Sequence, residues 1–174
     1  MSEKANILEQ AGASLICVPC NTAQTPELHN RLTASVSTPV IHMPTEVVNE
    51  IARSGNKNVL LLATDGTVMS GMYQKLCSQR GIKVVVPNKS MQKVVMNLII
   101  AIKANKNDVV QNLAKRLKIF IETTGVDSVI LGCTELPMVA KLISVSGVLQ
   151  FDSLAILAAA CINSENERKN SESR

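Results

Sequence analysis

Two cysteines occupy matching positions in two similar stretches of the sequence. Residues 12–22 contain Cys20 and residues 125–135 contain Cys133, and each cysteine lies eight positions after the glycine that opens its stretch. Both stretches consist of an apolar segment typical of a strand, then the cysteine, then hydroxyl or amide residues that can open a helix. Ligands of α/β folds bind at the carboxyl ends of parallel strands. The repeat therefore predicts two similar halves that bring both thiols to one cleft.

A thiol at the start of a helix can do acid–base chemistry. The helix dipole and nearby backbone N–H groups favour the thiolate, and the same N–H groups, with Asn21, Thr22 and Thr134, can hold a substrate carboxylate. A thiolate and a thiol on opposite faces of one carbon atom could then remove a proton from one side and deliver a proton to the other. The alternative is that both cysteines are small buried side chains at strand ends. The matched pair favours the functional interpretation.

The remaining cysteines and histidines give weaker signals. Cys17 and Cys20 form a Cys-x-x-Cys motif, which is typical of redox and zinc sites. Residues three apart in an extended strand point to opposite faces, and no second motif completes a zinc site, so we disfavour both functions. Cys77 and Cys161 are predicted to pack on apolar faces of helices. His42 has no clustered partners and is at most a residue that lines the cleft.

The elements that must position the thiols alternate along the chain. Short apolar or β-branched segments predict strands at residues 15–20, 40–43, 59–64, 83–87, 128–133 and 148–151. Helical patterns lie at residues 3–11, 26–34, 45–54, 68–80, 91–104, 108–123, 136–144 and 154–163. Alternating units with buried strands predict an α/β fold with parallel sheets covered on both faces. The chain opens with a helix, so we expect that a preceding strand–helix portion is missing.

Composition and charge disfavour several classes of protein. Hydrophobic residues make up 46% of the 174 residues, which excludes global disorder, and aromatic residues make up only 2%, which disfavours nucleic-acid binding by base stacking. The net charge of +4 is not gathered into a dense basic cluster, so no nucleic-acid partner is expected. The longest apolar runs, 59–63 and 98–102, are too short to span a membrane. Five cysteines without a secretory signal favour a cytoplasmic location.

Two segments around the paired cysteines identify a related family. Residues 20–23 (Cys-Asn-Thr-Ala) and 132–137 (Gly-Cys-Thr-Glu-Leu-Pro) resemble the two signature segments of the aspartate/glutamate racemases, in particular their aspartate racemase branch. Residues 64–73 resemble the family's central turn, in which hydroxyls meet the substrate carboxylate. The resemblance covers nearly the whole chain. It implies two pseudo-symmetric α/β halves, the first incomplete at its N-terminus, and a racemase that needs no cofactor.

The resemblance also assigns roles to particular residues. Cys20 and Cys133 would be the catalytic acid and base, and Lys103 stands where the family has a lysine that contacts the side-chain carboxylate of the substrate. The implied substrate-binding residues are Asn21, Thr22, Thr64, Lys103, Thr134 and Glu135. The implied partner is a small acidic amino acid, aspartate or glutamate, with no pyridoxal phosphate, no metal and no membrane. The sequence leaves a homodimer open.

The chain departs from the family pattern at three places. Gln24 replaces a histidine, Asp152 lacks the histidine that usually follows it, and a Gly-rich strand with an Arg-bearing loop, about 60 residues, is absent from the start. We expect this chain to be less active than one extended upstream. The alternatives are a non-catalytic relic and a relative that uses one thiol, such as a decarboxylase or a maleate-type isomerase. The presence of both cysteines favours two-base racemisation.

The repeat and the resemblance together predict how the chain divides. We expect residues 1–43 and 148–163 to form the first half and residues 44–147 to form the second half. Residues 164–174 are polar and balanced in charge, and we expect them to form a frayed tail.

Overall fold

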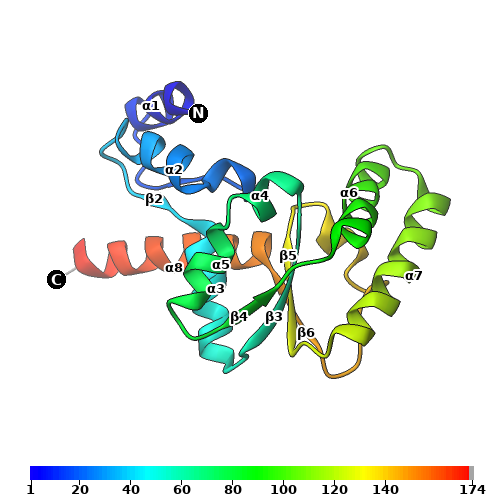
Figure 1. The fold of residues 1–174 in the computed structure, drawn as a ribbon. Coiled ribbons are helices and arrows are strands. Elements are labelled where there is room, and N and C mark those ends of the chain that lie inside the picture. The colour runs from blue at the N-terminus through cyan, green and yellow to red at the C-terminus, as the bar shows by residue number, and fades with distance from the viewer. Residues whose placement is uncertain (173–174) are drawn as a thin grey trace.

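A computed structural model describes residues 1–172 and contains two parallel sheets with helices around them (Figure 1). The strands are β1 (Ile16–Cys17), β2 (Val40–Ile41), β3 (Asn58–Ala63), β4 (Lys83–Val85), β5 (Ser128–Gly132) and β6 (Leu149–Asp152). The helices are α1 (Ser2–Gln10), α2 (Pro26–Thr33), α3 (Met43–Ser54), α4 (Asp65–Met69), α5 (Met72–Ser78), α6 (Lys89–Lys103), α7 (Asn107–Thr124) and α8 (Ser153–Glu172). Two short 3₁₀ helices, η1 (Thr22–Gln24) and η2 (Leu136–Val139), complete the described chain.

The larger sheet has the strand order β4-β3-β5-β6, with all neighbours parallel. Helices α6 and α7 cover one face, and α3, α5 and α8 cover the other, as Figure 1 shows. Every residue of β5 is buried, and so are residues 59–63 of β3, because the two central strands have helices on both sides. This arrangement confirms the predicted α/β fold with parallel sheets.

A smaller two-stranded sheet lies apart from the larger one, together with α1 and α2 (Figure 1). Its strands β1 and β2 are parallel, and Ile16 packs with Ala5 and Leu32 in a separate apolar cluster. The Glu9 carboxylate at the end of α1 accepts hydrogen bonds from the backbone N–H groups of Ser37 and Thr38, both at 2.7 Å. These bonds tie α1 to the loop that enters β2.

The last strand and helix connect the two sheets. Strand β6 pairs with β5 at the edge of the larger sheet, so it lies with the elements of residues 44–147 rather than beside β1 and β2. Helix α8 packs against α3 and β6 and continues to β2 of the smaller sheet. The division of the chain into 1–43 with 148–163 and 44–147 stays a prediction about folding units.

Three predicted elements differ from the structure. The helix expected at 68–80 is interrupted at Gly71, whose φ of 66° places it in the left-handed region. The helix expected at 136–144 is the single 3₁₀ helix η2, because its bonds run between residues three apart, a pattern that seldom extends further. The tail expected to fray from residue 164 is helical to residue 172, and residues 173–174 lie outside the described chain.

Ion pairs within α8 support the helical structure of the polar tail. Arg168 and Lys169 place their nitrogens 2.8 Å and 3.7 Å from Oε1 of Glu165, at the spacings that bring side chains together on a helix. Among residues 1–172, no helix combines the length and the hydropathy that a membrane-spanning helix needs.

Candidate active site

Both paired cysteines follow a parallel strand and precede a 3₁₀ helix. Cys133 comes directly after β5 and before η2, and Cys20 comes three residues after β1 and before η1. The structure thus repeats the local arrangement that the sequence predicted. The glycine before Cys133 is required by close packing, because a Cβ at Gly132 would lie 3.1 Å from the backbone oxygen of Leu62.

Cys133 lies in a chain of polar contacts with Glu135 and Lys103. The Cys133 thiol donates a hydrogen bond to Oε2 of Glu135 at 2.9 Å, and the Lys103 ammonium lies 3.2 Å from Oε1 of the same carboxylate. The hydroxyl of Thr134 also donates to Oε2, at 3.2 Å. The Glu135 side chain is 19% exposed and the Lys103 side chain 60% exposed, so the carboxylate is the shielded centre of this group and the ammonium faces solvent.

The electrostatics of this group keep Cys133 protonated. Burial and the hydrogen bond to the Glu135 carboxylate raise the pKa of the Cys133 thiol to about 12, against a smaller opposing effect of Lys103. Burial alone would raise the pKa of Glu135, but hydrogen bonds from Cys133 and Lys103 outweigh it and hold that pKa below its usual value. The resting site therefore contains a carboxylate and a neutral thiol.

Lys103 interacts electrostatically with both paired cysteines. The pKa of Lys103 lies above its usual value, first because of the hydrogen bond and charge of Glu135, and then because of the Cys133 and Cys20 thiols. Both thiols therefore lie within electrostatic reach of one ammonium. Cys20 is exposed, whereas Cys133 is buried, so the two thiols have different surroundings.

Three threonine hydroxyls form hydrogen bonds between η1 and the first turn of α4. The Thr22 hydroxyl lies 2.8 Å from the hydroxyls of both Thr64 and Thr67, which are 3.2 Å apart. The structure thus brings Thr22 and Thr64 together, and their role in substrate binding stays a prediction. Gly66 permits the approach, because a Cβ there would lie 3.0 Å from the methyl group of Thr22. Thr67 was not among the predicted site residues, although its segment was part of the family resemblance.

Asn21 is locked into a buried hydrogen-bond network. Its side-chain amide is 3% exposed, accepts a 2.6 Å hydrogen bond from the Tyr73 hydroxyl and donates a 3.0 Å bond to Ser153. The Ser153 hydroxyl donates in turn to the backbone oxygen of Leu131, at 2.8 Å. Asn21 therefore fixes the backbone after Cys20, and its role in substrate binding stays a prediction. Tyr73 and Ser153 were not among the predicted site residues, although Tyr73 ends the segment that resembles the family's central turn, and nothing local in the sequence marks them as partners of Asn21.

Gln24 and His42 connect the strand before Cys20 to helix α3. The buried Gln24 amide donates to the backbone oxygen of Val18 and accepts a 2.8 Å hydrogen bond from the Met43 N–H. Both ring nitrogens of His42 are engaged, one by the Thr45 hydroxyl at 2.6 Å and one by the backbone oxygen of Gln24 at 3.0 Å. The glutamine that replaces the family histidine is therefore a structural bridge in this chain.

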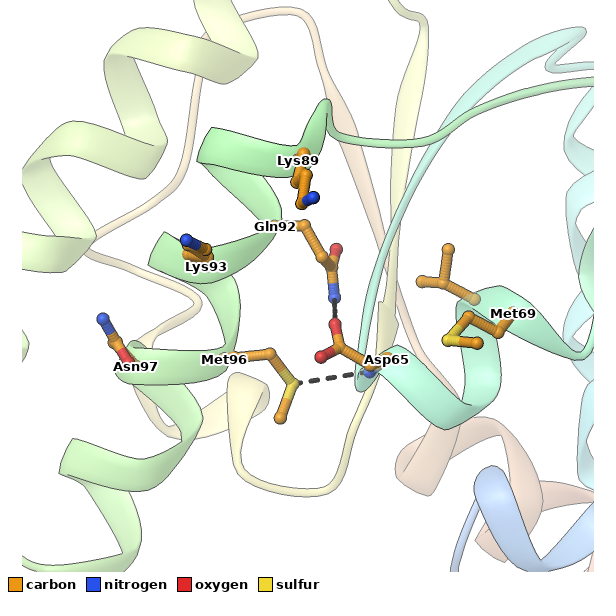
Figure 2. A pocket seen from close by; sticks show the side chains of 8 residues that line it. Asp65, Met69, Lys89, Gln92, Lys93, Met96 and Asn97 are labelled. Atoms are coloured by element: carbon orange, nitrogen blue, oxygen red, sulfur yellow. Dashed lines mark hydrogen bonds between the residues drawn. The ribbon is translucent and has the colours of Figure 1, made fainter.

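A cavity of about 600 Å³ lies between α4 and α6 (Figure 2), and Asp65, the residue after Thr64, lines it. The side-chain amide of Gln92 donates to the backbone oxygen of Ala63 at 3.0 Å and to Asp65 Oδ1 at 2.8 Å, and the Asp65 N–H contacts the Met96 sulfur at 3.4 Å. These bonds hold the turn that carries Thr64. The cysteines do not line this cavity. Within residues 1–172, no three His, Cys, Asp or Glu side chains gather as metal ligands do.

Comparisons with known proteins agree with the resemblance found in the sequence. The profile of the Asp/Glu/Hydantoin racemase family matches residues 1–161. The chain is 31% identical over 157 residues to the broad specificity amino-acid racemase RacX of Bacillus subtilis, a match that covers 90% of this chain and 66% of that protein. It is 31% identical over 156 residues to the glutamate racemase of Shewanella woodyi, covering 86% of this chain and 56% of that protein.

Solved structures show the same similarity. The aspartate racemase of Picrophilus torridus superposes with a TM-score of 0.77 at 30% identity, over 94% of this chain and 67% of that one. An aspartate racemase homologue from Pyrococcus horikoshii superposes with a TM-score of 0.76 at 32% identity, over 93% of this chain and 71% of that one. The chain spans between 56% and 66% of the length of the two curated relatives named above.

Proposed function

Because the chain belongs to the Asp/Glu/hydantoin racemase family, we propose that it interconverts the enantiomers of aspartate or glutamate, with Cys20 and Cys133 as the proton-transfer groups. The names of the relatives support an amino-acid racemase, and the arrangement of Cys133, Glu135 and Lys103 supports the choice of residues and of an acidic substrate. That arrangement is the observation that carries the proposal.

The first proton transfer uses the different surroundings of the two thiols. Cys133 is held as a neutral thiol by Glu135, so it is ready to donate a proton. Cys20, in thiolate form, removes the α-proton from one face of the substrate, and Cys133 delivers its proton to the other face. The products are the opposite enantiomer, a Cys20 thiol and a Cys133 thiolate. The reverse reaction begins from this state, and the Lys103 ammonium stabilises the Cys133 thiolate.

Negative charge develops on the substrate carboxylate as the α-proton leaves. Hydrogen-bond donors aimed at such an enediolate lower the barrier, because they are already in place when the charge appears. The hydroxyls of Thr22, Thr64 and Thr67 form one cluster, and Thr134 lies beside Cys133. A hydroxyl that bonds to another threonine in this structure can turn towards the substrate when it binds.

Lys103 would select the acidic side chain of the substrate. An ammonium group has three N–H donors, so Lys103 can hold a substrate carboxylate and remain paired with Glu135. A hydrogen bond to a charged group contributes about 1.5–3 kcal/mol, which corresponds to a factor of roughly 10 to 150 in binding. An amino acid without a side-chain carboxylate would not gain this contribution.

The test follows the α-proton of each substrate in deuterated water by NMR. L-aspartate, D-aspartate and L-glutamate are compared with L-alanine, and we expect exchange and inversion of the acidic amino acids only. Lys103→Met should lower kcat/KM for aspartate by a factor of 10 or more, whereas Lys115→Met, at an exposed position of α7, should leave it unchanged. Equal rates for alanine and aspartate, or no exchange with any acidic amino acid, would contradict the proposal.

A further inference from the structure

Two cysteines outside the proposed site lie on neighbouring elements of the structure. Cys17 ends strand β1 and is exposed, and Cys161 lies in the middle of helix α8 and is partly buried. The Cys17 thiol is close enough to Cys161 to contribute to the raised pKa of Cys161. Both are free in the structure. Neither is used by the proposed reaction, so their contact requires its own explanation.

The neighbouring contacts place these two cysteines together independently. Cys17 is the partner of Ile41 across the two-stranded sheet, and both Ile41 and Cys161 pack against the same apolar cluster. The loop before β1 also contacts α8, because the Ser14 hydroxyl donates a hydrogen bond to Oε2 of Glu165 at 3.3 Å. Ile16 points into the cluster with Ala5 and Leu32, so the next residue, Cys17, points to the opposite face of the small sheet. Helix α8, which carries Cys161, contacts the neighbouring strand β2.

The Cys-x-x-Cys motif of the sequence suggests a different partner, Cys20, which the backbone disfavours. A reactive pair of that type normally lies on the first turn of a helix, where the spacing brings the two sulfurs together. Here Cys17 belongs to a strand, and the Cys20 N–H bonds to the backbone oxygen of Val18 at 2.8 Å in a tight turn. Cys17 therefore ends a strand and Cys20 lies in the turn after it, so the two cysteines do not form a helical redox pair. Cys20 belongs to the proposed active site, and Cys17 faces α8.

We propose that Cys17 and Cys161 form a reversible disulfide that joins β1 to α8 when the protein meets a peroxide. Hydrogen peroxide oxidises the exposed Cys17 thiol to a sulfenic acid and is itself reduced to water. The Cys161 sulfur then attacks the sulfenic sulfur, a sulfur–sulfur bond forms, and the sulfur–oxygen bond breaks. The departing hydroxide combines with the proton of Cys161 to give a second water. A thiol reductant reverses the reaction.

Exposure decides the order of these two steps. Peroxide reaches Cys17 from solvent, whereas Cys161 is partly covered. Burial raises the pKa of Cys161 to about 11, and the adjacent Cys17 thiol adds to the rise, so Cys161 stays a neutral thiol until the sulfenic acid forms. Cys77 is fully buried in the core, with its pKa raised to about 11 by burial, and serves as an inert reference.

The test maps disulfides in the full chain after mild peroxide treatment. Free thiols are alkylated, and the protein is digested with trypsin without reduction. Cys17 and Cys20 share the fragment of residues 5–31, and Cys161 lies in the fragment of residues 142–168. We expect these two fragments joined, with a mass lower by two hydrogens than their sum, and separated again by dithiothreitol. The link should persist in Cys20→Ser and Cys77→Ser and disappear in Cys17→Ser and Cys161→Ser.

A second measurement, thermal unfolding, detects the disulfide between Cys17 and Cys161 in the folded protein. A disulfide from residue 17 to residue 161 closes a long loop of the unfolded chain, so oxidation should raise Tm by about 10 °C in the unaltered chain. The same treatment should leave Tm of Cys17→Ser unchanged. A link from Cys17 to Cys20 or to a second chain would overturn the proposal. It would also be overturned by Cys17 oxidised without any link, or by a link that forms only in denaturant.

Discussion

The contact between Cys133 and Glu135 makes a quantitative prediction about thiol reactivity. In Glu135→Gln the carboxylate no longer accepts the Cys133 hydrogen bond, and the amide can donate to a thiolate instead. Losing a hydrogen bond to a charged group removes about 1.5–3 kcal/mol of preference for the neutral thiol, and each pKa unit corresponds to about 1.36 kcal/mol. The pKa of Cys133 should therefore fall from about 12 to roughly 10–11.

The lower pKa of Cys133 predicts a faster disulfide exchange at this thiol. At pH 8.5, well below either value, a fall of about 1 to 2 pKa units raises the thiolate fraction by a factor of roughly 10 to 100. A less basic thiolate is also less nucleophilic, with a Brønsted slope of about 0.4–0.5, so the net acceleration of disulfide exchange is roughly 3- to 10-fold.

The rate is measured for Cys133 alone. Reaction with dithiodipyridine is quenched at intervals, and mass spectrometry follows the tryptic fragment of residues 119–141, which contains no other cysteine. Glu122→Gln, an exposed carboxylate on α7, is the matched control and should react like the unaltered chain. Equal rates in Glu135→Gln and the unaltered chain would refute the account of how Cys133 is kept neutral.

Three further predictions test other parts of the structure. Tyr73→Phe leaves the buried Asn21 carbonyl without its hydrogen bond, so the free energy of unfolding measured by urea titration should fall by about 1–3 kcal/mol; no change would show that the bond is dispensable. Burial raises the pKa of Cys77 from 9.0 to about 11, so the folded state keeps a proton that the unfolded chain loses. This thiol should not affect stability below pH 9, and between pH 9 and 11 the free energy of unfolding of the unaltered chain should fall by about 3 kcal/mol more than that of Cys77→Ala. Dialysis against a chelator should leave the racemase rate unchanged, and the purified protein should show no aldimine absorbance; a rate lost on dialysis and restored by metal would contradict cofactor independence.

The central sheet was predictable because its signal is local. Residues 59–63 and 128–132 are continuous apolar runs, as expected of strands buried on both faces, and the structure places both at the centre of the larger sheet. The position of Cys133 at the end of the second run followed from the same pattern. Lys103 was identified through the family resemblance alone, since a lysine at a helix end is ordinarily only a solvated side chain.

The partners of the site residues were not predictable, since they lie far apart in the sequence. Asn21 meets Tyr73 and Ser153 only because η1, α5 and α8 lie together in the folded chain. Patterns of hydrophobicity describe which face of an element is buried, but they do not say which polar groups will meet inside. The break at Gly71 was missed for a different reason, because an isolated glycine in a helical pattern marks either a tolerated residue or a left-handed turn.

The most direct test of the two-thiol proposal follows α-proton exchange of pure L-aspartate and pure D-aspartate in deuterated water with the unaltered chain, Cys20→Ala and Cys133→Ala. The unaltered chain should exchange and invert both enantiomers. Inversion needs a thiol on each face of the α-carbon, so each variant should lose racemisation in both directions. Each should retain exchange of one enantiomer only, and the two variants should differ in which one. Near-normal racemisation by either variant, or retention of the same enantiomer's exchange by both, would contradict the account.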